Sequence, residues 1–168
     1  MSMLLWQIMR LLKVEQFKCR GLTEGELQIC KMVFADLIDY SRVKIMNQPY
    51  LPWQTAGILM APNGCIYMKD TDYCEDFSLH SRWIQSIFIH EMAHIYQHQR
   101  QVNVLLKGAF LQTAMFASFK KYNPYHYTFE ANKPYFDYNI EQQGDIARDI
   151  FLKRIPNIIL SPELITKN

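Results

Sequence analysis

The chain has 168 residues, which is the usual length of one folded domain. Its composition, with 49% hydrophobic and 20% charged residues, is that of a globular protein and excludes a disordered or collagen-like chain. Lys and Arg number 18 against 16 Asp and Glu, a net charge of +2, and no segment concentrates the basic residues. We therefore expect no nucleic-acid partner.

No stretch of the sequence is apolar for long enough to span a membrane. Residues 102–119 come nearest, but Lys107 and two side-chain amides interrupt them, so they predict a buried helix. The first 13 residues lack a basic leader and carry polar residues within their apolar run. We therefore expect no cleavable signal peptide and synthesis in the cytoplasm, which leaves export by a secretion system open.

The cysteines form no Cys-x-x-Cys pair and show no zinc-finger spacing. They are Cys19, Cys30, Cys65 and Cys74. We expect four reduced and mostly buried thiols, with a Cys65–Cys74 disulfide as the alternative in an oxidising compartment.

In chain order, apolar residues among the first 13 predict a short helix. Thr23-x-x-Glu26 is a capping box, and the apolar residues that follow it at helical spacing predict a helix over residues 24–39. Asn63-Gly64, between the apolar runs 57–61 and 65–68, is a strong hairpin signal and predicts two antiparallel strands. The second strand could offer an open edge to an extended peptide.

An acidic loop, residues 69–76, precedes a helix that Ser78 or Ser81 caps and that ends near residue 99. The helix over residues 102–119, an aromatic loop and a last helix over residues 140–153 follow. We therefore predict an α+β fold, a mostly helical single domain over residues 1–168 with a small antiparallel sheet. Its parts are N-terminal helices within residues 1–50 and a catalytic core over residues 57–153.

Residues 90–94 read His-Glu-Met-Ala-His. On a helix this spacing places His90 and His94 on one face, one turn apart, where both imidazoles can bind one zinc ion. Glu91 then lies on the metal side. A carboxylate there can take the proton of a zinc-bound water and pass it to a leaving amine.

Glu141 is the candidate for the third metal ligand, because catalytic sites with two His and one Glu take the Glu from a separate helix. Asp145, one turn later, would orient a histidine ligand, most simply His90. Gly144 is costly inside a helix and predicts a close approach to the His90 helix. His98 competes as third ligand, but it lies about 12 Å from His90 along a continuous helix, which is too far.

Hydrolysis of a peptide bond also needs a hydrogen-bond donor to the oxyanion that forms at the carbonyl. The aromatic loop offers His126, Tyr125 and Tyr127, with Tyr122 and Tyr138 farther out. We expect His126 and Tyr127 as catalytic candidates, and the choice within the loop stays open.

Residues 88–97 and 138–145 together resemble the gluzincin-type zinc metallopeptidases encoded beside Rhs and Vgr genes of bacterial type VI secretion systems. These proteins are kin to metallopeptidase-like domains of contractile injection systems. The resemblance covers roughly residues 57–151, including the hairpin strand before the first histidine. It departs from the family at Gly144, where an alanine is expected, and in the first fifty residues.

The resemblance implies that Zn²⁺ is bound by His90, His94 and Glu141, with Glu91 as catalytic base. It implies hydrolysis of peptide bonds in a protein or in the peptide stems of peptidoglycan, by an effector that meets secretion-system components or an immunity protein. Two alternatives remain. One is a non-catalytic structural or cargo module of a secretion apparatus with a structural zinc site, and the other is a zinc amidase that acts on cell-wall peptides.

Overall fold

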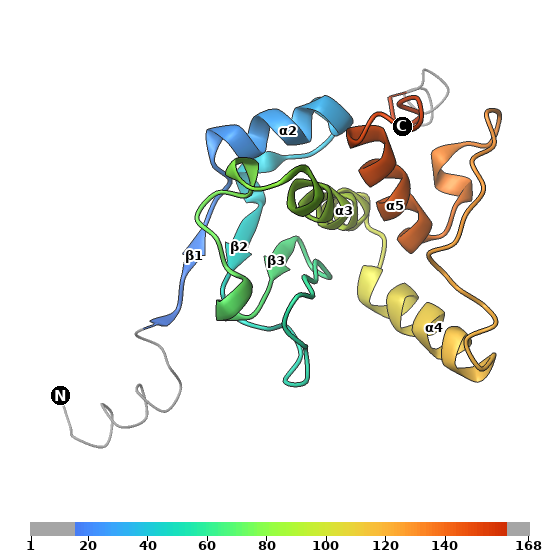
Figure 1. Cartoon of the computed structure of the whole chain (residues 1–168), viewed down its shortest axis with the longest axis horizontal. Coiled ribbons are helices and arrows are strands. Elements are labelled where there is room, and N and C mark those ends of the chain that lie inside the picture. Colours follow the sequence, from blue (N-terminus) through green and yellow to red (C-terminus); the bar gives the residue numbers. More distant parts are fainter. Residues whose placement is uncertain (1–15, 161–168) are drawn as a thin grey trace.

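The computed structural model describes residues 16–160, so the helix expected among the first 13 residues lies outside the described part (Figure 1). The main elements are β1 (Cys19–Arg20), α2 (Glu24–Phe34), β2 (Lys44–Met46), β3 (Cys65–Tyr67), α3 (Arg82–Gln99), α4 (Val104–Ala117) and α5 (Ile140–Phe151). Short 3-10 helices lie at Tyr40–Arg42, Asp70–Asp72, Phe77–Leu79 and Tyr135–Asp137. The described residues therefore confirm the predicted α+β class, mostly helical with a small sheet.

The sheet has the strand order β1-β2-β3 and is mixed. β1 runs antiparallel to β2, with Cys19 opposite Met46, whereas β2 runs parallel to β3, with Ile45 opposite Ile66. The expected sheet was antiparallel. The difference arises because β3 pairs with β2 rather than with the segment just before it. A long connection separates β2 from β3, and such a connection allows the two strands to run parallel, which a tight turn does not.

The expected hairpin is reduced to one residue pair. Met60 and Tyr67 exchange main-chain hydrogen bonds of 3.0 and 2.8 Å across the turn, and this pair forms an isolated antiparallel bridge. Gly64 has a φ of +88°, which the Asn-Gly turn requires and which most side chains disfavour. The turn was therefore predicted correctly, but residues 57–61 form no regular strand.

Local hydrogen bonds explain where the helices start. The Thr23 hydroxyl accepts from the Glu26 amide at 3.1 Å, and the Glu26 carboxylate accepts from the Thr23 amide at 2.9 Å, which confirms the capping box. Of the two candidate caps of α3, the structure selects Ser81, whose hydroxyl accepts from the Ile84 amide. α2 ends at Phe34, earlier than expected, because Ala35 has a φ of +46° and leaves the helix.

α3 forms the centre of the molecule. Figure 1 shows it with α2 above, the strands on one side and α5 on the other. Its buried apolar side chains join those of α2, the sheet and α5 in one cluster, which includes Phe34, Ile45, Ile66, Phe88, Met92 and Phe151. This surrounding explains why even its polar residues Gln97 and His94 are buried.

α4 differs from the buried helix that its apolar sequence predicted. Val104 is its only buried residue, and Leu106 and Phe110 are 67% and 72% exposed. α4 packs against α3 and α5 with one side, while in residues 16–160 no other element covers its outer side (Figure 1). None of the helices described in residues 16–160 has the length and apolarity of a membrane span.

All four cysteines carry free thiols, and Cys65 and Cys74 form no disulfide. Cys30 is buried, Cys65 and Cys74 are partly buried, and Cys19 is exposed, so the expectation that most are buried is wrong. Burial raises the pKa of the Cys30 thiol well above its ordinary value, which makes this thiol unreactive.

The fully buried carboxylate of Glu26 connects three segments by hydrogen bonds. Its two oxygens accept hydrogen bonds from both terminal nitrogens of Arg20 at 2.7 Å, and one also accepts from the Phe77 amide at 2.8 Å. Arg20 belongs to β1, Glu26 to α2, and Phe77 to the segment that leads into α3. The ion pair therefore holds β1 and the entry to α3 against α2.

We predict that Glu26→Ala lowers the free energy of unfolding by about 3–5 kcal/mol, because it leaves the Arg20 guanidinium without its partner in a partly buried place. Urea denaturation followed by far-ultraviolet circular dichroism measures this change. The control is Glu24→Ala, an exposed residue of the same helical turn, which should change the stability by less than about 0.5 kcal/mol. Equal effects of the two substitutions would contradict the prediction.

Candidate metal centre

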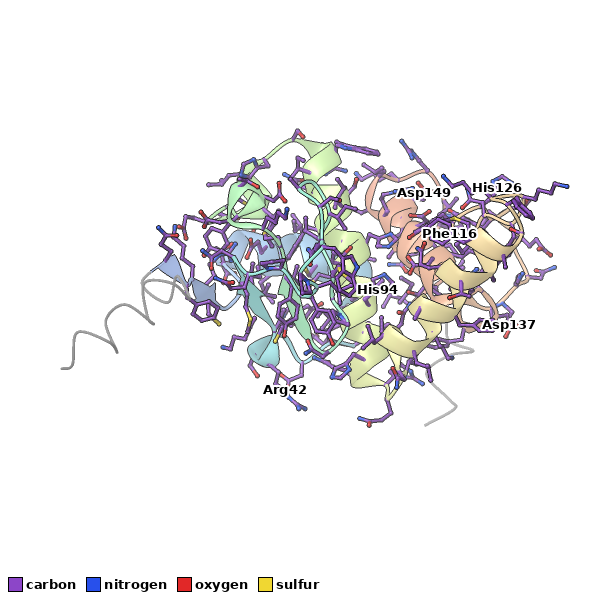
Figure 2. All side chains as sticks on the ribbon, turned by 90° about the horizontal axis from the view of Figure 1, so that it is seen from below. Arg42, His94, Phe116, His126, Asp137 and Asp149 are labelled. Atoms are coloured by element: carbon purple, nitrogen blue, oxygen red, sulfur yellow. The ribbon has the colours of Figure 1, made fainter. Side chains whose placement is uncertain are left out.

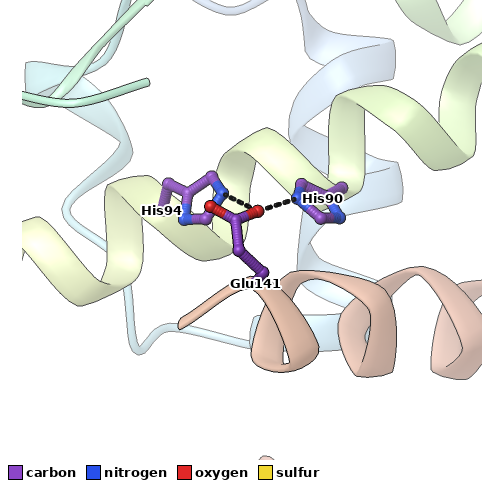
Figure 3. A group of neighbouring side chains, drawn as sticks. All are labelled: His90, His94 and Glu141. Carbon is purple, nitrogen blue, oxygen red and sulfur yellow. Dashed lines mark ion pairs between the residues drawn. The ribbon is translucent and has the colours of Figure 1, made fainter. Parts of the chain in front are cut away.

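His90 and His94 on α3 and Glu141 on α5 form one group that could hold a metal ion (Figure 3). The Glu141 carboxylate lies between the imidazoles, with Oε2 3.6 Å from Nε2 of His90 and 3.7 Å from Nε2 of His94. The three candidate ligand atoms lie within 4.8 Å of one another. The structure therefore brings together the three residues that the sequence selected as ligands.

Asp145 fixes the orientation of His90. Its Oδ1 lies 3.0 Å from Nδ1 of His90, and an ionised carboxylate can only accept, so Nδ1 must carry the hydrogen. The lone pair of the neutral imidazole is then on Nε2, which faces Glu141. Asp145 thus has the position that the sequence predicted for it, one turn after Glu141.

Gln97 fixes the orientation of His94 in the same way. The Gln97 amide nitrogen donates to the Ile140 carbonyl at 2.9 Å and to Oε1 of Gln143 at 3.0 Å. Its amide oxygen therefore faces Nδ1 of His94, 2.8 Å away, and accepts the hydrogen there. Sequence analysis missed this role, although the spacing of three residues placed Gln97 close to His94 on α3.

The three donor groups fit a zinc-like divalent ion. Both histidines keep Nδ1 as a donor to a buried acceptor, which leaves Nε2 free as a ligand, and a carboxylate stands opposite. In tetrahedral coordination with bonds of about 2.0–2.1 Å, neighbouring ligand atoms lie about 3.3–3.4 Å apart. The observed distances of 3.6 and 3.7 Å are close to this value.

In the metal-free protein the same geometry favours the protonated forms of the two histidines. Burial lowers the pKa of His90, but its hydrogen bonds to Asp145 and Glu141 outweigh burial and raise the pKa to about 10. Burial would raise the pKa of Glu141, but hydrogen bonds to both histidines hold it at about 2. A metal ion therefore has to displace a proton from this group, and acidic conditions work against its binding.

Glu91 lies beside the two histidines in the wall of the same cavity. It is buried, and its Oε2 has no hydrogen-bond partner among the described residues. Burial raises the pKa of the carboxyl group, although the histidines act in the opposite direction. A carboxylate with a raised pKa and an unpaired oxygen is suited to accept a proton from a reacting group.

The cavity beside the metal group has a volume of about 870 Å³. Residues 57–62 form one wall, α4 forms another, and the histidines, Glu91 and one face of α5 form the floor. Gly108 faces Glu141 across this space, where a Cβ atom would lie 3.9 Å from Oε1. The cavity is open to solvent and large enough for several residues of a peptide.

Of the aromatic loop, the residue that lines the cavity is Tyr125. The amide of Gln112 on α4 donates to its hydroxyl oxygen at 2.9 Å, so the hydroxyl hydrogen remains free to donate. Burial is the main cause that raises the pKa of Tyr125 to about 12, which keeps this hydrogen in place at neutral pH.

His126 and Tyr127, the two expected catalytic candidates of this loop, do not line the cavity. The Tyr127 hydroxyl donates to Oδ2 of Asp149 at 2.6 Å, about two turns of α5 beyond Glu141. His126 is exposed, and Figure 2 shows it at the outer side of the molecule, away from His94. The conformation of the loop, which the sequence did not reveal, decides this placement.

Two other expectations concern the hairpin turn. His98 packs against Gly64, where a Cβ atom would lie 3.1 Å from its Cδ2, and it is not part of the metal group. The edge of β3 that faces away from β2 is taken up at Tyr67 by the bridge to Met60. The edge of β3 is therefore less open to an added peptide than the sequence suggested.

Gly144 allows α5 to approach His90. A Cβ atom at this position would lie 2.5 Å from Cε1 of the His90 ring and 2.7 Å from each ring nitrogen, which is too close for any side chain. This confirms the close approach that the sequence predicted. The cost of glycine inside α5 is therefore offset by the position that it permits for His90.

We predict that Gly144→Ala weakens zinc binding by about 10- to 100-fold, because the new methyl group displaces the His90 ring. The fold should persist, since alanine favours the helix by about 1 kcal/mol. Competition with a chromophoric chelator measures the affinity, and circular dichroism checks the fold. The control is Gly108→Ala, whose methyl group meets Glu141 only at ordinary contact distance. Unchanged affinity in Gly144→Ala would show that the His90 ring is not held in this position.

No model of a known protein family matches the sequence. The chain is 48% identical over 136 residues to the type VI secretion system spike protein VgrG2b of Pseudomonas aeruginosa. The match covers 80% of this chain and 13% of that protein's length. Among solved structures, the effector domain of Pseudomonas aeruginosa VgrG2b matches with a TM-score of 0.74 and 44% identity, over 83% of each chain. The chain therefore belongs to the family of the VgrG2b effector domain.

Proposed function

We propose that the protein is a zinc metallopeptidase that acts as an effector of a type VI secretion system. The observation that carries the proposal is the pair of histidines whose Nδ1 atoms are both engaged, so that both Nε2 atoms face one carboxylate. This arrangement supplies the ligands of a catalytic zinc site with two His and one Glu. Zn²⁺ bound there lowers the pKa of a bound water and polarises the carbonyl of a substrate.

The remaining chemistry belongs to side chains of the cavity. The unpaired carboxylate oxygen of Glu91 takes the proton of the attacking water and passes it to the leaving amine. Tyr125 donates its free hydroxyl hydrogen to the oxygen of the cleaved carbonyl, since Gln112 occupies only the acceptor side of that hydroxyl. Asp145 and Gln97 hold the two histidines in the orientation that metal binding needs.

The number and placement of the donor groups favour a catalytic zinc site over a structural one. Structural zinc sites are closed by four protein ligands, whereas here three protein groups face a cavity of about 870 Å³. A buried carboxylate without a hydrogen-bond partner also costs stability, and Glu91 has such an oxygen next to the metal group. A structural or cargo module would have no use for it.

The secretion setting is supported by the family, because VgrG2b is a type VI secretion spike protein. On this proposal the chain meets secretion-system components, and its substrate is a protein or the peptide part of peptidoglycan. A zinc amidase that acts on cell-wall peptides would use the same residues and differ in the bond that it cleaves. Digestion of peptide libraries and of purified peptidoglycan separates these two substrates.

We predict that the purified protein binds close to one zinc ion per chain and that Glu141→Ala loses it, because two histidines alone hold zinc weakly. Mass spectrometry measures the zinc content of the wild-type protein, of Glu141→Ala and of the control His98→Ala, all prepared in the same way. His98→Ala should keep its zinc, since His98 packs against the hairpin turn. A protein that stays free of metal after zinc is supplied would overturn the proposed function.

Glu91→Gln should keep the zinc and the fold but lose peptidase activity by about 10²- to 10⁴-fold, because an amide cannot accept the proton. The rate of cleavage of quenched fluorescent peptide libraries measures the loss. Glu24→Gln, an exposed substitution of the same kind, should retain full activity. If Glu91→Gln leaves the biological effect of the protein unchanged, the structural-module alternative is correct.

A further inference from the structure

One cationic side chain lies in the wall of the catalytic cavity. Arg148 lines it together with Glu141 and Asp145, which precede Arg148 on α5 by seven and three residues and therefore share its face. The other titratable residues that line the cavity are His90, Glu91, His94 and Tyr125. Among the described residues of this wall, Arg148 is thus the only one with a permanent positive charge.

The guanidinium of Arg148 is held in place, but not all of its N–H donors are used. Its Nη2 lies 3.1 Å from Oδ1 of Asp145, and its Cζ lies 5.9 Å from the centre of the Trp83 ring. Its Nε has no hydrogen-bond partner among residues 16–160, and the side chain is 26% exposed. A guanidinium has more N–H donors than this single ion pair uses, so donors remain for a ligand.

Asp145 does not fully neutralise this cation. The same Oδ1 that faces Arg148 also accepts from Nδ1 of His90 at 3.0 Å, so one carboxylate oxygen serves two cationic or polar donors. Away from the metal group and Asp145, the other residues that line the cavity are apolar or uncharged. Outside the metal group, a negatively charged part of a ligand would therefore be attracted at Arg148.

The contacts of Asp145 limit how far the Arg148 guanidinium lies from the metal group. Its Nη2 lies 3.1 Å from Oδ1 of Asp145, and that oxygen lies 3.0 Å from Nδ1 of His90, so the guanidinium is within about 6 Å of the His90 ring. An extended peptide advances about 3.3 Å per residue, so Arg148 would meet a residue within about three positions of the bond that reacts at the metal group.

We propose that Arg148 binds a carboxylate of the peptide substrate and gives the enzyme a preference for acidic peptides. This inference rests on the proposed peptidase function, which supplies the peptide. The carboxylate is either an acidic side chain or a free C-terminus, placed within about three residues of the cleaved bond. A planar guanidinium is well suited to this task, because it pairs with a carboxylate through two parallel hydrogen bonds.

The test uses three mixtures of heptapeptides, each with an acetylated N-terminus and random neutral residues. The first has a fixed Glu and an amidated C-terminus, the second has Gln in place of Glu, and the third has Gln and a free C-terminal carboxylate. Binding to the zinc-loaded full chain is measured by competition with a fluorescent peptide. Cleavage rates follow in parallel, so the kcat and KM effects are separated.

We expect the wild-type protein to bind the first or the third mixture about tenfold more tightly than the second, as one charge-assisted contact allows. Which of the two is preferred distinguishes a side chain from a C-terminus. Arg148→Gln should remove the preference, Arg148→Lys should keep part of it, and Arg42→Gln, an exposed control with the same loss of charge, should keep all of it.

A role limited to positioning Asp145 gives a different result. Arg148→Gln would then lower kcat and zinc affinity equally for all three mixtures, and the preference in binding would stay. That outcome overturns the proposal, as does a wild-type protein that shows no preference or binds none of the mixtures. A clear binding preference without any cleavage would instead count against the proposed peptidase activity and leave the role of Arg148 in place.

Discussion

α5 lies so close to α3 at Gly144 that only a hydrogen atom fits between the helix backbone and the His90 ring. This close packing determines the geometry of the metal group. It places the Glu141 carboxylate between two imidazoles that belong to the other helix, and it brings Asp145 within hydrogen-bond distance of His90. The interface between two helices and the candidate metal centre are therefore the same part of the structure.

The hydrogen bonds that orient the histidines also stabilise this interface. Gln97 reaches from α3 to the first turn of α5, where it bonds to the Ile140 carbonyl and to Gln143, while it accepts from His94. All these groups are buried, so each unmade bond would cost about 1–3 kcal/mol. A substitution that shifts α5 would disturb ligands and stability together. Farther away, Glu26 fastens the segment before α3 to α2 and so holds the other end of the same helix.

What the sequence could predict depended on how far apart the interacting residues are. The capping box at Thr23, the Asn63-Gly64 turn and the shared face of His90 and His94 are local patterns, and the structure contains all three. Gly144 also carried information, because a glycine inside a helix needs a reason such as close approach. Local patterns of this kind were therefore sufficient to predict the start of α2, the turn and the histidine pair, whereas Glu141 was selected by comparison with other zinc sites that have two His and one Glu.

The remaining features depend on contacts between distant residues. Strands of two or three residues have no readable periodicity, so neither β1 nor the parallel pairing of β2 with β3 could be predicted. Gln97 finds its partners on α5, more than forty residues later. In the aromatic loop the backbone path alone decides that Tyr125, and not His126 or Tyr127, faces the cavity. The apolar sequence of α4 likewise does not show whether other residues pack on its outer side.

The uncovered side of α4 has a practical consequence. Dyes such as ANS normally signal lost tertiary packing, because they bind apolar surface that a native protein hides. Here the native fold itself displays such a surface through Leu106, Phe110 and Phe116, so these dyes should fluoresce before any unfolding begins. Emission from Trp53 and Trp83 is a poor substitute, since both side chains are largely solvated in the folded state. Backbone signals remain the faithful reporters of the folding equilibrium of this protein.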